Sequence, residues 1–274
     1  MRIYKILNNN AVVVKDGGQE KIVMGNGIAF QKRKNDIIPN AKIEKIFTLH
    51  GPSSEKFQQL LATLPEKHIE LAEQIISYAE GYLQAPLHDH IHIALTDHLS
   101  FALERMEQGL TIQNKLLNEI KLLYKKEFEI GLWARQEIKK VLGIEIPLDE
   151  VAHIALHIHT AKMGSSSMTE TLKQATILRD FIEHVENELQ IKIEESSIDY
   201  QRLITHLRFA LSRIQQGSEF EPMDEEMHEL IREKYGKAYQ CSKSVVTHLQ
   251  QEYDITFPSS EIAYISLHLQ RLIR

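Results

Sequence analysis

Several features common in secreted and membrane proteins are missing from this sequence. Its 274 residues contain one cysteine, Cys241, which cannot form an internal disulfide, so we expect a reducing compartment. No apolar run approaches the length needed to cross a membrane, and Met1–Lys5 leads into asparagines rather than into the apolar core of a signal peptide. We therefore predict a cytoplasmic protein without direct membrane insertion.

Familiar catalytic motifs are missing as well. The chain contains no GxSxG, no phosphate-binding P-loop and no CxxC, so we expect neither an enzyme nor a bound cofactor. The composition, with 43% hydrophobic and 26% charged residues, is typical of a globular protein. Its length allows about two or three domains.

What the chain does contain is a repeated pattern. Residues 95–109 (LTDHLSFALERMEQG) recur as residues 204–217 (ITHLRFALSRIQQG), which matches His98 with His206. A second matched segment follows each copy, with the pairs Pro147/Pro258, Glu150/Glu261, Ala152/Ala263, Ile154/Ile265, Leu156/Leu267 and His157/His268. Such self-similarity indicates that one helical module with two histidines is used twice.

Charge is distributed unevenly along the chain. Residues 1–50 contain nine Lys or Arg and four Asp or Glu, a net charge of +5, whereas the whole chain carries -6 and the remainder therefore carries -11. A basic segment on an acidic body indicates that the first segment contacts a polyanion and that the body does not.

Short runs rich in Ile, Val and Tyr fill this basic segment. They predict strands at residues 2–7, 11–15, 20–24 and 43–49, separated by turns such as Asn8–Asn10. We therefore predict a small antiparallel β domain of about four strands, without the helix pair of a helix-turn-helix DNA reader. About 55 residues make a thin core, so we expect this domain to be dimeric.

Two interpretations of the basic segment remain open from composition. In the first, the asparagines and the Gly25/Gly27 backbone approach nucleic acid closely, Phe30 stacks on a base and Lys32–Lys34 contacts phosphates, which suits RNA with unstacked bases. In the second, the asparagines and glycines only make turns, Phe30 belongs to the core, and the lysines form a solvated edge.

The rest of the chain has helical periodicity. We read Gly51–Ser54 as a linker and predict helices with apolar faces over 57–64 and 69–79, and further helices over 89–109, 110–126, 129–142 and 149–162. Gly164–Ser167 reads as a second linker, after which the order repeats to residue 274. The fold class is thus a β domain at 1–52 followed by two all-α bundles of about five helices each, at 56–163 and 169–274.

The matched histidines, His98, His157, His206 and His268, lie on or beside apolar helix faces. A single histidine of this kind is usually a hydrogen-bonded core residue, but four at matched positions favour a role in carrying a phosphoryl group. Metal binding is the alternative, because Glu150, His153 and His157 share a helix face and His88, His90 and His92 add imidazoles. The second copy replaces His153 by Tyr264, which argues against a metal site in both modules.

The motifs resemble those of the BglG/SacY family of transcriptional antiterminators. The segments KILNNN (5–10) and MGNGIAFQK (24–32) are similar to the co-antiterminator RNA-binding domain of that family. The segments LTDH (95–98), IALH (154–157), TH (205–206) and LH (267–268) are similar to its two phosphotransferase-system (PTS) regulation domains. Within the family, the sequence resembles the sucrose-responsive members most.

The resemblance implies a dimeric N-terminal domain that binds a bulged RNA hairpin overlapping a terminator, so that transcription continues into sugar-uptake genes. It places the following residues on the RNA-facing side: Asn8, Asn10, Gly25, Gly27 and Phe30, with Lys5, Asn26 and Gln31 as weaker candidates.

The same resemblance implies control by phosphorylation. Phosphate reaching His98 or His157 through the sugar permease, Enzyme II, would inactivate the protein, whereas phosphate from HPr on His206 or His268 would activate it. Asp97, beside His98, is replaced by Thr205, so the two modules need not respond alike. An added phosphate would separate subunits in one module and join them in the other if Arg208 or Arg213 lies nearby.

The expected partners are therefore an RNA hairpin, HPr, Enzyme II and a second copy of the chain, but not DNA. Two other functions stay open at this point. One is a DNA-binding activator with the same regulatory modules, and the other is a metal-dependent helical-bundle enzyme with an accessory β domain.

Overall fold

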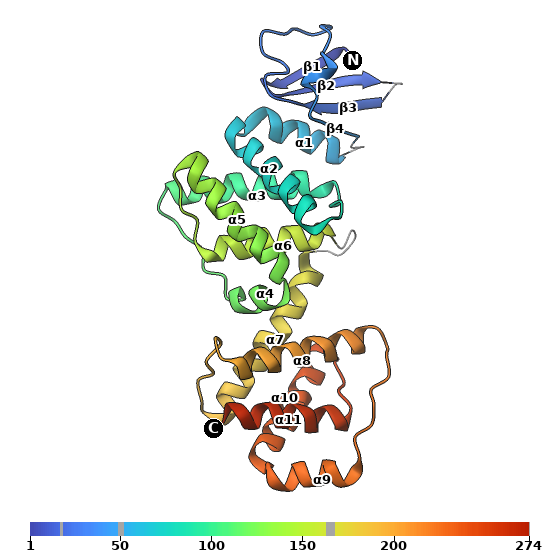
Figure 1. The fold of residues 1–274 in the computed structure, drawn as a ribbon, viewed down its shortest axis with the longest axis vertical. Coiled ribbons are helices and arrows are strands. Elements are labelled where there is room, and N and C mark those ends of the chain that lie inside the picture. The colour runs from blue at the N-terminus through green and yellow to red at the C-terminus, as the bar shows by residue number, and fades with distance from the viewer. Residues whose placement is uncertain (17–18, 49–51, 163–167, 274) are drawn as a thin grey trace. The chain divides into compact units, whose positions relative to one another are not determined.

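The computed structural model describes residues 1–16, 19–48, 52–162 and 168–273. The chain forms two compact units, one made of residues 1–113 and 126–166 and the other of residues 114–125 and 167–274 (Figure 1). In the described ranges, no helix is both long and apolar enough to span a membrane.

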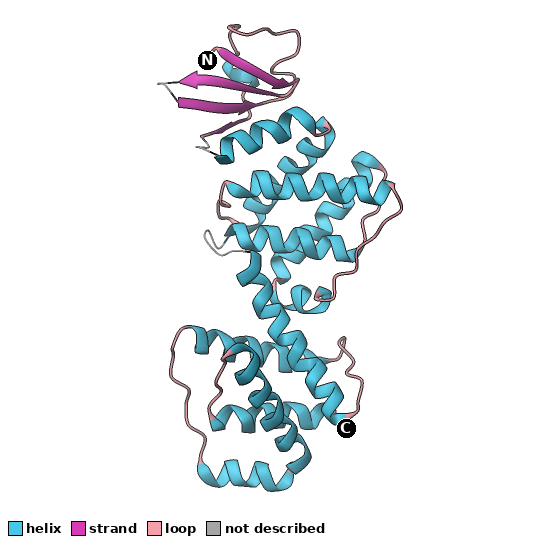
Figure 2. Ribbon diagram, turned by 180° about the vertical axis from the view of Figure 1, so that it is seen from behind, coloured by secondary structure: helices cyan, strands magenta, loops and turns pink. Residues whose placement is uncertain are grey.

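A four-stranded antiparallel sheet forms the N-terminal part of the first unit, as predicted (Figure 2). The strands follow one another in the sheet in chain order: β1 (Ile3–Asn8), β2 (Ala11–Asp16), β3 (Gln19–Met24) and β4 (Lys45–Phe47). Asn9 and Asn10 turn the chain between β1 and β2, so that Asn8 pairs with Ala11. Asparagine suits this position because its side chain bonds to nearby backbone groups.

Both faces of the sheet are covered within the first unit. Alternate residues of a strand point to opposite faces, so Val12 and Val14 enter one apolar cluster and Val13 enters another. The first cluster is formed by β-domain residues, Ile3, Val12, Val14, Val23, Ile28, Ala29 and Ile38. The second cluster joins the sheet to helices and contains Ala11, Val13, Ile22, Met24, Phe47, Phe57, Leu60, Leu61, Ile69 and Ile93. Helices of the same chain thus extend the thin core of the sheet, and the expected dimer stays a prediction.

The helices of the first unit are α1 (Pro52–Thr63), α2 (Glu66–Leu83), α3 (His90–Glu107), α5 (Lys125–Leu142) and α6 (Leu148–Lys162). The interpretation of Gly51–Ser54 as a linker is wrong for Pro52–Ser54, which opens α1, while Gly51 and the second linker, Gly164–Ser167, lie outside the described residues. Proline is well tolerated in a first helical turn, where its missing N–H has no helical partner.

The predicted helix over 110–126 is shorter than expected. Residues 110–116 are not helical, and α4 covers only Leu117–Leu123. Gly109 has φ +75°, a left-handed conformation that ends α3. The Asn114 side chain then accepts a hydrogen bond from the Leu116 N–H at 2.9 Å, a local bond that holds a turn ahead of α4.

The second unit contains α4 and the last five helices of the described chain. These are α7 (Met168–Leu189), α8 (Ile198–Gln215), α9 (Glu225–Lys234), α10 (Gly236–Tyr253) and α11 (Ser259–Leu272). The Ser197 hydroxyl caps α8 by accepting a hydrogen bond from the Tyr200 N–H. Tyr200 also places its hydroxyl 3.4 Å from the Glu119 carboxylate of α4.

The repeat appears in the fold as two equivalent helix pairs. Helix α3 packs on α6 in the first unit, and α8 packs on α11 in the second. Each pair carries one matched histidine on either helix, so the predicted duplication of a histidine-bearing helical module is confirmed.

Candidate functional site: two histidine pairs and an N-terminal edge

The first histidine pair lies between α3 and α6. The ring centroids of His98 and His157 are 4.8 Å apart, and His153 lies 5.4 Å from His98. Nε2 of His98 is 3.2 Å from Oε2 of Glu150, a distance for an ion pair although the two groups are not aligned for a hydrogen bond. The other oxygen of Glu150 is paired with the Arg105 guanidinium.

Burial and charged neighbours together set the electrostatics of this pair. Burial, followed by repulsion from the neighbouring His98 and His153, lowers the pKa of His157 to about 3. Burial alone would raise the pKa of Glu150, but His98 and then Arg105 outweigh it and hold that pKa below its usual value. At neutral pH, His157 is therefore a neutral imidazole, and a neutral imidazole can act as a nucleophile.

The second pair, between α8 and α11, has the same construction. The rings of His206 and His268 are 5.0 Å apart, and Nε2 of His206 is hydrogen-bonded to Oε2 of Glu261 at 2.7 Å. Burial, followed by the nearby His206, lowers the pKa of His268 to about 4. Tyr264 takes the place of His153, with its ring 6.1 Å from His206.

Each pair opens into a shallow hollow that reaches solvent. The first has a volume of about 430 Å³ and is lined by His98 and His157 together with Lys56, His90, Ile93, Ala94, Asp97 and Phe101. The second has a volume of about 480 Å³ and is lined by His206 and His268 together with Ile198, Gln201, Arg202, Thr205 and Phe209. Both histidine pairs thus border a hollow that is open to solvent.

Sequence reasoning noted the matched glutamates but missed their role. Glu150 and Glu261 contact His98 and His206 respectively, and each precedes the second histidine of its module by seven residues. That spacing places them about two turns away on the same helix face, which is a signal a sequence carries.

Arg208 and Arg213 of the second module each lie over a phenylalanine ring. Arg208 sits over the Phe209 ring at 4.9 Å, and Arg213 over the Phe220 ring at 5.8 Å. Arg202, rather than Arg208 or Arg213, is among the described residues that line the hollow.

No group of three or more His, Cys, Asp or Glu side chains is arranged to hold a metal ion in the part of the chain that the structure describes. The carboxylate of Glu150, a ligand in the metal-site alternative, is instead engaged with His98 and Arg105.

The RNA-facing candidates gather at one end of the sheet, where the β1–β2 turn and the turn after β3 lie. We call this end the N-terminal or RNA-facing edge. The Asn8 side chain accepts a hydrogen bond from the Asn10 N–H at 2.8 Å, and the Asn10 side chain accepts one from the Gly27 N–H at 2.7 Å. These bonds tie the β1–β2 turn to the turn after β3, so the predicted residues of the two segments are brought together.

The other candidates differ in exposure. Phe30 is 62% exposed, which excludes the interpretation that it belongs to the core. Lys5, Asn26 and Gln31 are exposed as well. Gly25 is buried, and a Cβ there would overlap the carbonyl oxygen of Lys42, so its lack of a side chain already serves internal packing.

Comparison with known proteins identifies the two parts of the chain. The CAT RNA binding domain family matches residues 1–56, and the PRD domain family matches residues 73–161 and 179–272. The solved structure "Crystal structure of GlcT CAT-PRDI" aligns with a TM-score of 0.55 and 32% identity, covering 60% of this chain and 98% of that chain.

Full-length relatives agree with this division. The chain is 39% identical to "Transcription antiterminator LicT" of Bacillus subtilis (strain 168), over 100% of this chain and 99% of that protein. It is 36% identical to "Beta-glucoside operon antiterminator" of Dickeya chrysanthemi, over 99% and 96%. It is 30% identical to "GlcA/glcB genes antiterminator" of Staphylococcus carnosus (strain TM300), over 97% and 94%. These are names of regulators rather than enzymes, and the chain belongs to the family of transcription antiterminators that combine a CAT RNA-binding domain with PRD domains.

Proposed function

We propose that this antiterminator is sugar-responsive and that phosphorylation of its histidines by the phosphotransferase system controls RNA binding. The N-terminal domain binds a bulged hairpin overlapping a terminator in nascent mRNA. We keep residues 1–52, 56–163 and 169–274 as its domains and a homodimer as its active form.

The observation that supports phosphorylation best is the matched histidine–glutamate–histidine arrangement of the two modules. In each, burial keeps one imidazole neutral, a carboxylate holds the other, and a hollow gives access. During transfer, the bond between phosphorus and the donor side chain breaks as a new N–P bond forms on the acceptor imidazole. His98, His157, His206 and His268 are the proposed acceptors.

Differences between the modules support opposite responses. In the first, Glu150 is shared between His98 and Arg105, so a phosphate there competes with an existing carboxylate for the arginine. In the second, Arg202 lines the hollow and its ion pair with Asp199 is exposed and long, at 3.4 Å, so an added phosphate can compete for it. We propose that Enzyme II acts on the first module and inactivates the protein, and that HPr acts on the second and activates it.

Two observations bear on the inducing sugar, and they point to different sugars. The sequence motifs favour sucrose, whereas relatives carry β-glucoside and glc names. Transcript levels of the controlled genes, measured in cells given sucrose or a β-glucoside, decide between them.

Transcription through the leader of the controlled genes tests the proposed function. In a single-round reaction with purified polymerase, protein phosphorylated on the second module should increase read-through past the terminator. Phe30→Ala should remove most of this increase, because an exposed ring that stacks on a base contributes about 1–3 kcal/mol. Equal read-through with and without protein contradicts the proposal.

A further inference from the structure

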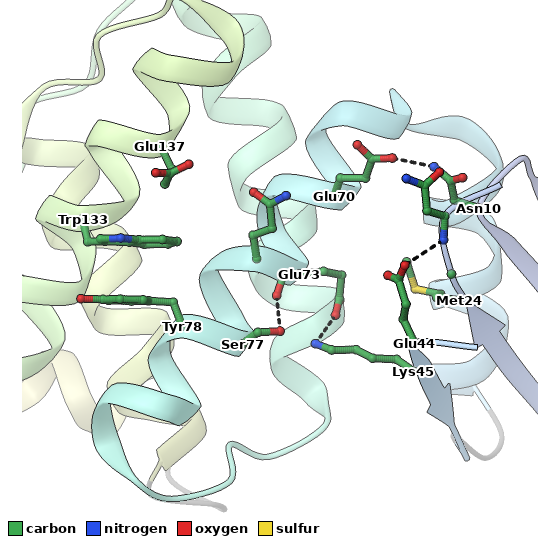
Figure 3. A pocket seen from close by; sticks show the side chains of 13 residues that line it. Asn10, Met24, Glu44, Lys45, Glu70, Glu73, Ser77, Tyr78, Trp133 and Glu137 are labelled. Atoms are coloured by element: carbon green, nitrogen blue, oxygen red, sulfur yellow. Dashed lines mark hydrogen bonds and ion pairs between the residues drawn. The ribbon is translucent and has the colours of Figure 1, made fainter. Parts of the chain in front are cut away.

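The edge of the sheet that carries the RNA-facing asparagines is in contact with helix α2. The backbone N–H of Asn9 donates a hydrogen bond to Oε1 of Glu66 at 3.0 Å. The Asn10 side-chain amide donates one to Oε1 of Glu70 at 2.5 Å, which Figure 3 shows. Carboxylates of the first PRD module thus occupy hydrogen-bond donors that an RNA phosphate or base would use.

An apolar contact beside these bonds holds the two elements together. Val13, Met24 and Phe47 of the sheet share a buried cluster with Phe57 and Leu61 of α1. The rings of Phe47 and Phe57 meet edge to face, with centroids 5.3 Å apart.

Asn8 adds a third polar link, because its side-chain amide donates to the Leu61 carbonyl at 2.8 Å. This carbonyl belongs to helix α1, which also packs against the sheet through Phe57 and Leu61. All three asparagines of the turn are therefore engaged by the first module.

Ionic contacts to the buried Glu73 also join β4 to the helices. Nζ of Lys45 in β4 is 2.8 Å from one oxygen of Glu73, and Nδ1 of His92 is 2.7 Å from the other. Burial alone would raise the pKa of Glu73, but His92 and Lys45 outweigh it and keep that pKa below its usual value. His92 lies on α3, six residues before His98, so one helix carries both a docking residue and a proposed phosphorylation site.

A cavity of about 860 Å³ separates the remaining surfaces and has an acidic wall. Asn10, Gly25 and Asn26 line it on the side of the sheet, and Glu70, Glu73 and Glu137 are among the residues lining it on the side of the helices (Figure 3). An RNA backbone placed against the asparagines would face these carboxylates at short range, where like charges repel.

We propose that helix α2 is an internal competitor of RNA, which occupies the RNA-facing edge in the closed form seen here and must leave it before the hairpin binds. This inference rests on the proposed function. Its new element is the competing surface, formed by Glu66 and Glu70 and fastened by the Lys45–Glu73–His92 contact.

Charge-matched variants of the full chain test the competition. Glu66→Ala/Glu70→Ala removes the competing carboxylates and leaves every RNA-facing residue in place, whereas Glu104→Ala/Glu107→Ala removes two carboxylates from α3 of the same unit. The probe is the inverted repeat from the leader of the controlled genes, transcribed as an isolated hairpin. The first variant should bind it with a Kd lower by about three- to ten-fold than the second, since the two competing hydrogen bonds that it lacks are exposed to solvent and contribute modestly.

Amide hydrogen exchange without RNA verifies the contact itself. Exchange at Asn9 should be faster in Glu66→Ala/Glu70→Ala than in the control, because its N–H loses its acceptor. Unchanged exchange at Asn9, or faster exchange with an unchanged Kd, overturns the inference. If wild type and both variants all fail to prefer the hairpin over its fully paired version, the proposed function itself fails.

A reversible lock provides an independent test. In Lys45→Cys/Glu73→Cys, the two cysteines are joined by a thiol-reactive cross-linker that contains a reducible disulfide. This keeps the sheet on the helices without changing an RNA-facing residue. The locked protein should bind the hairpin at least about ten-fold more weakly than after reduction. Equal affinity before and after reduction contradicts the inference.

Discussion

Replacing His157 with glutamine should make the first unit less sensitive to acid. In the folded protein the pKa of His157 is lowered to about 3, chiefly by burial and then by the nearby His98 and His153. An unfolded histidine titrates near 6.5. Between these two values the unfolded chain binds a proton that the folded chain rejects, so folding becomes less favourable as the pH falls.

The size of the effect follows from the shift. Each pH unit in this window costs about 1.4 kcal/mol of stability, so lowering the pH from 6.5 to 5 costs about 2 kcal/mol through His157 alone. Above pH 6.5 both states leave this ring neutral and the cost vanishes. His157→Gln should therefore lose about 2 kcal/mol less stability than wild type between pH 7.5 and pH 5.

The single tryptophan provides a local probe for this experiment. Trp133 lies in α5 of the first unit, so its fluorescence during urea unfolding follows that unit. His88→Gln removes an exposed imidazole from the same unit and serves as the matched control. If wild type and His157→Gln lose equal stability between the two pH values, His157 is not the buried neutral group described above.

Three further predictions concern the N-terminal edge and the second histidine pair. Gly25→Ala should destabilise the sheet by about 3 kcal/mol or more, seen as faster amide exchange in β3, because a Cβ has no room there. Phe30→Ala should change stability by less than about 0.5 kcal/mol yet weaken hairpin binding about ten-fold, because the ring is exposed. If the variant loses as much free energy of unfolding as of hairpin binding, the role of Phe30 is in packing. Glu261→Gln should slow phosphate incorporation at His206 about ten-fold relative to the exposed control Glu252→Gln, because it loses a charge-assisted hydrogen bond. Equal rates in these two variants would contradict that role of Glu261.

The fold was largely predictable because its signals are local or repeated. Turn residues at Asn8–Asn10 mark the first hairpin, and the matched pairs His98/His206 and His157/His268 mark equivalent helices. The segment 110–116 was predicted wrongly because apolar spacing continued through it. The left-handed Gly109 and the Asn114 turn, rather than hydrophobic periodicity, set the start of α4.

The candidate sites were less predictable because they depend on contacts distant in sequence. Glu150 meets His98 across two helices, 52 positions away from it, and no periodicity connects them. The burial of Gly25 depends on Lys42, which approaches only once the sheet has formed. The contact of Asn10 with Glu70 brings together two segments that the sequence assigns to different domains.

Hairpin affinity before and after phosphorylation tests the central claim most directly. Full-length protein is incubated with Enzyme I, HPr and phosphoenolpyruvate, and its Kd for the leader hairpin is compared with that of untreated protein and of His206→Ala/His268→Ala. We predict histidine-linked phosphate and a lower Kd in the wild type. In the variant we predict no phosphate at positions 206 and 268 and no decrease in Kd. Unchanged labelling in the variant, or a labelled wild type whose Kd equals that of the untreated protein, would contradict control of RNA binding by these histidines.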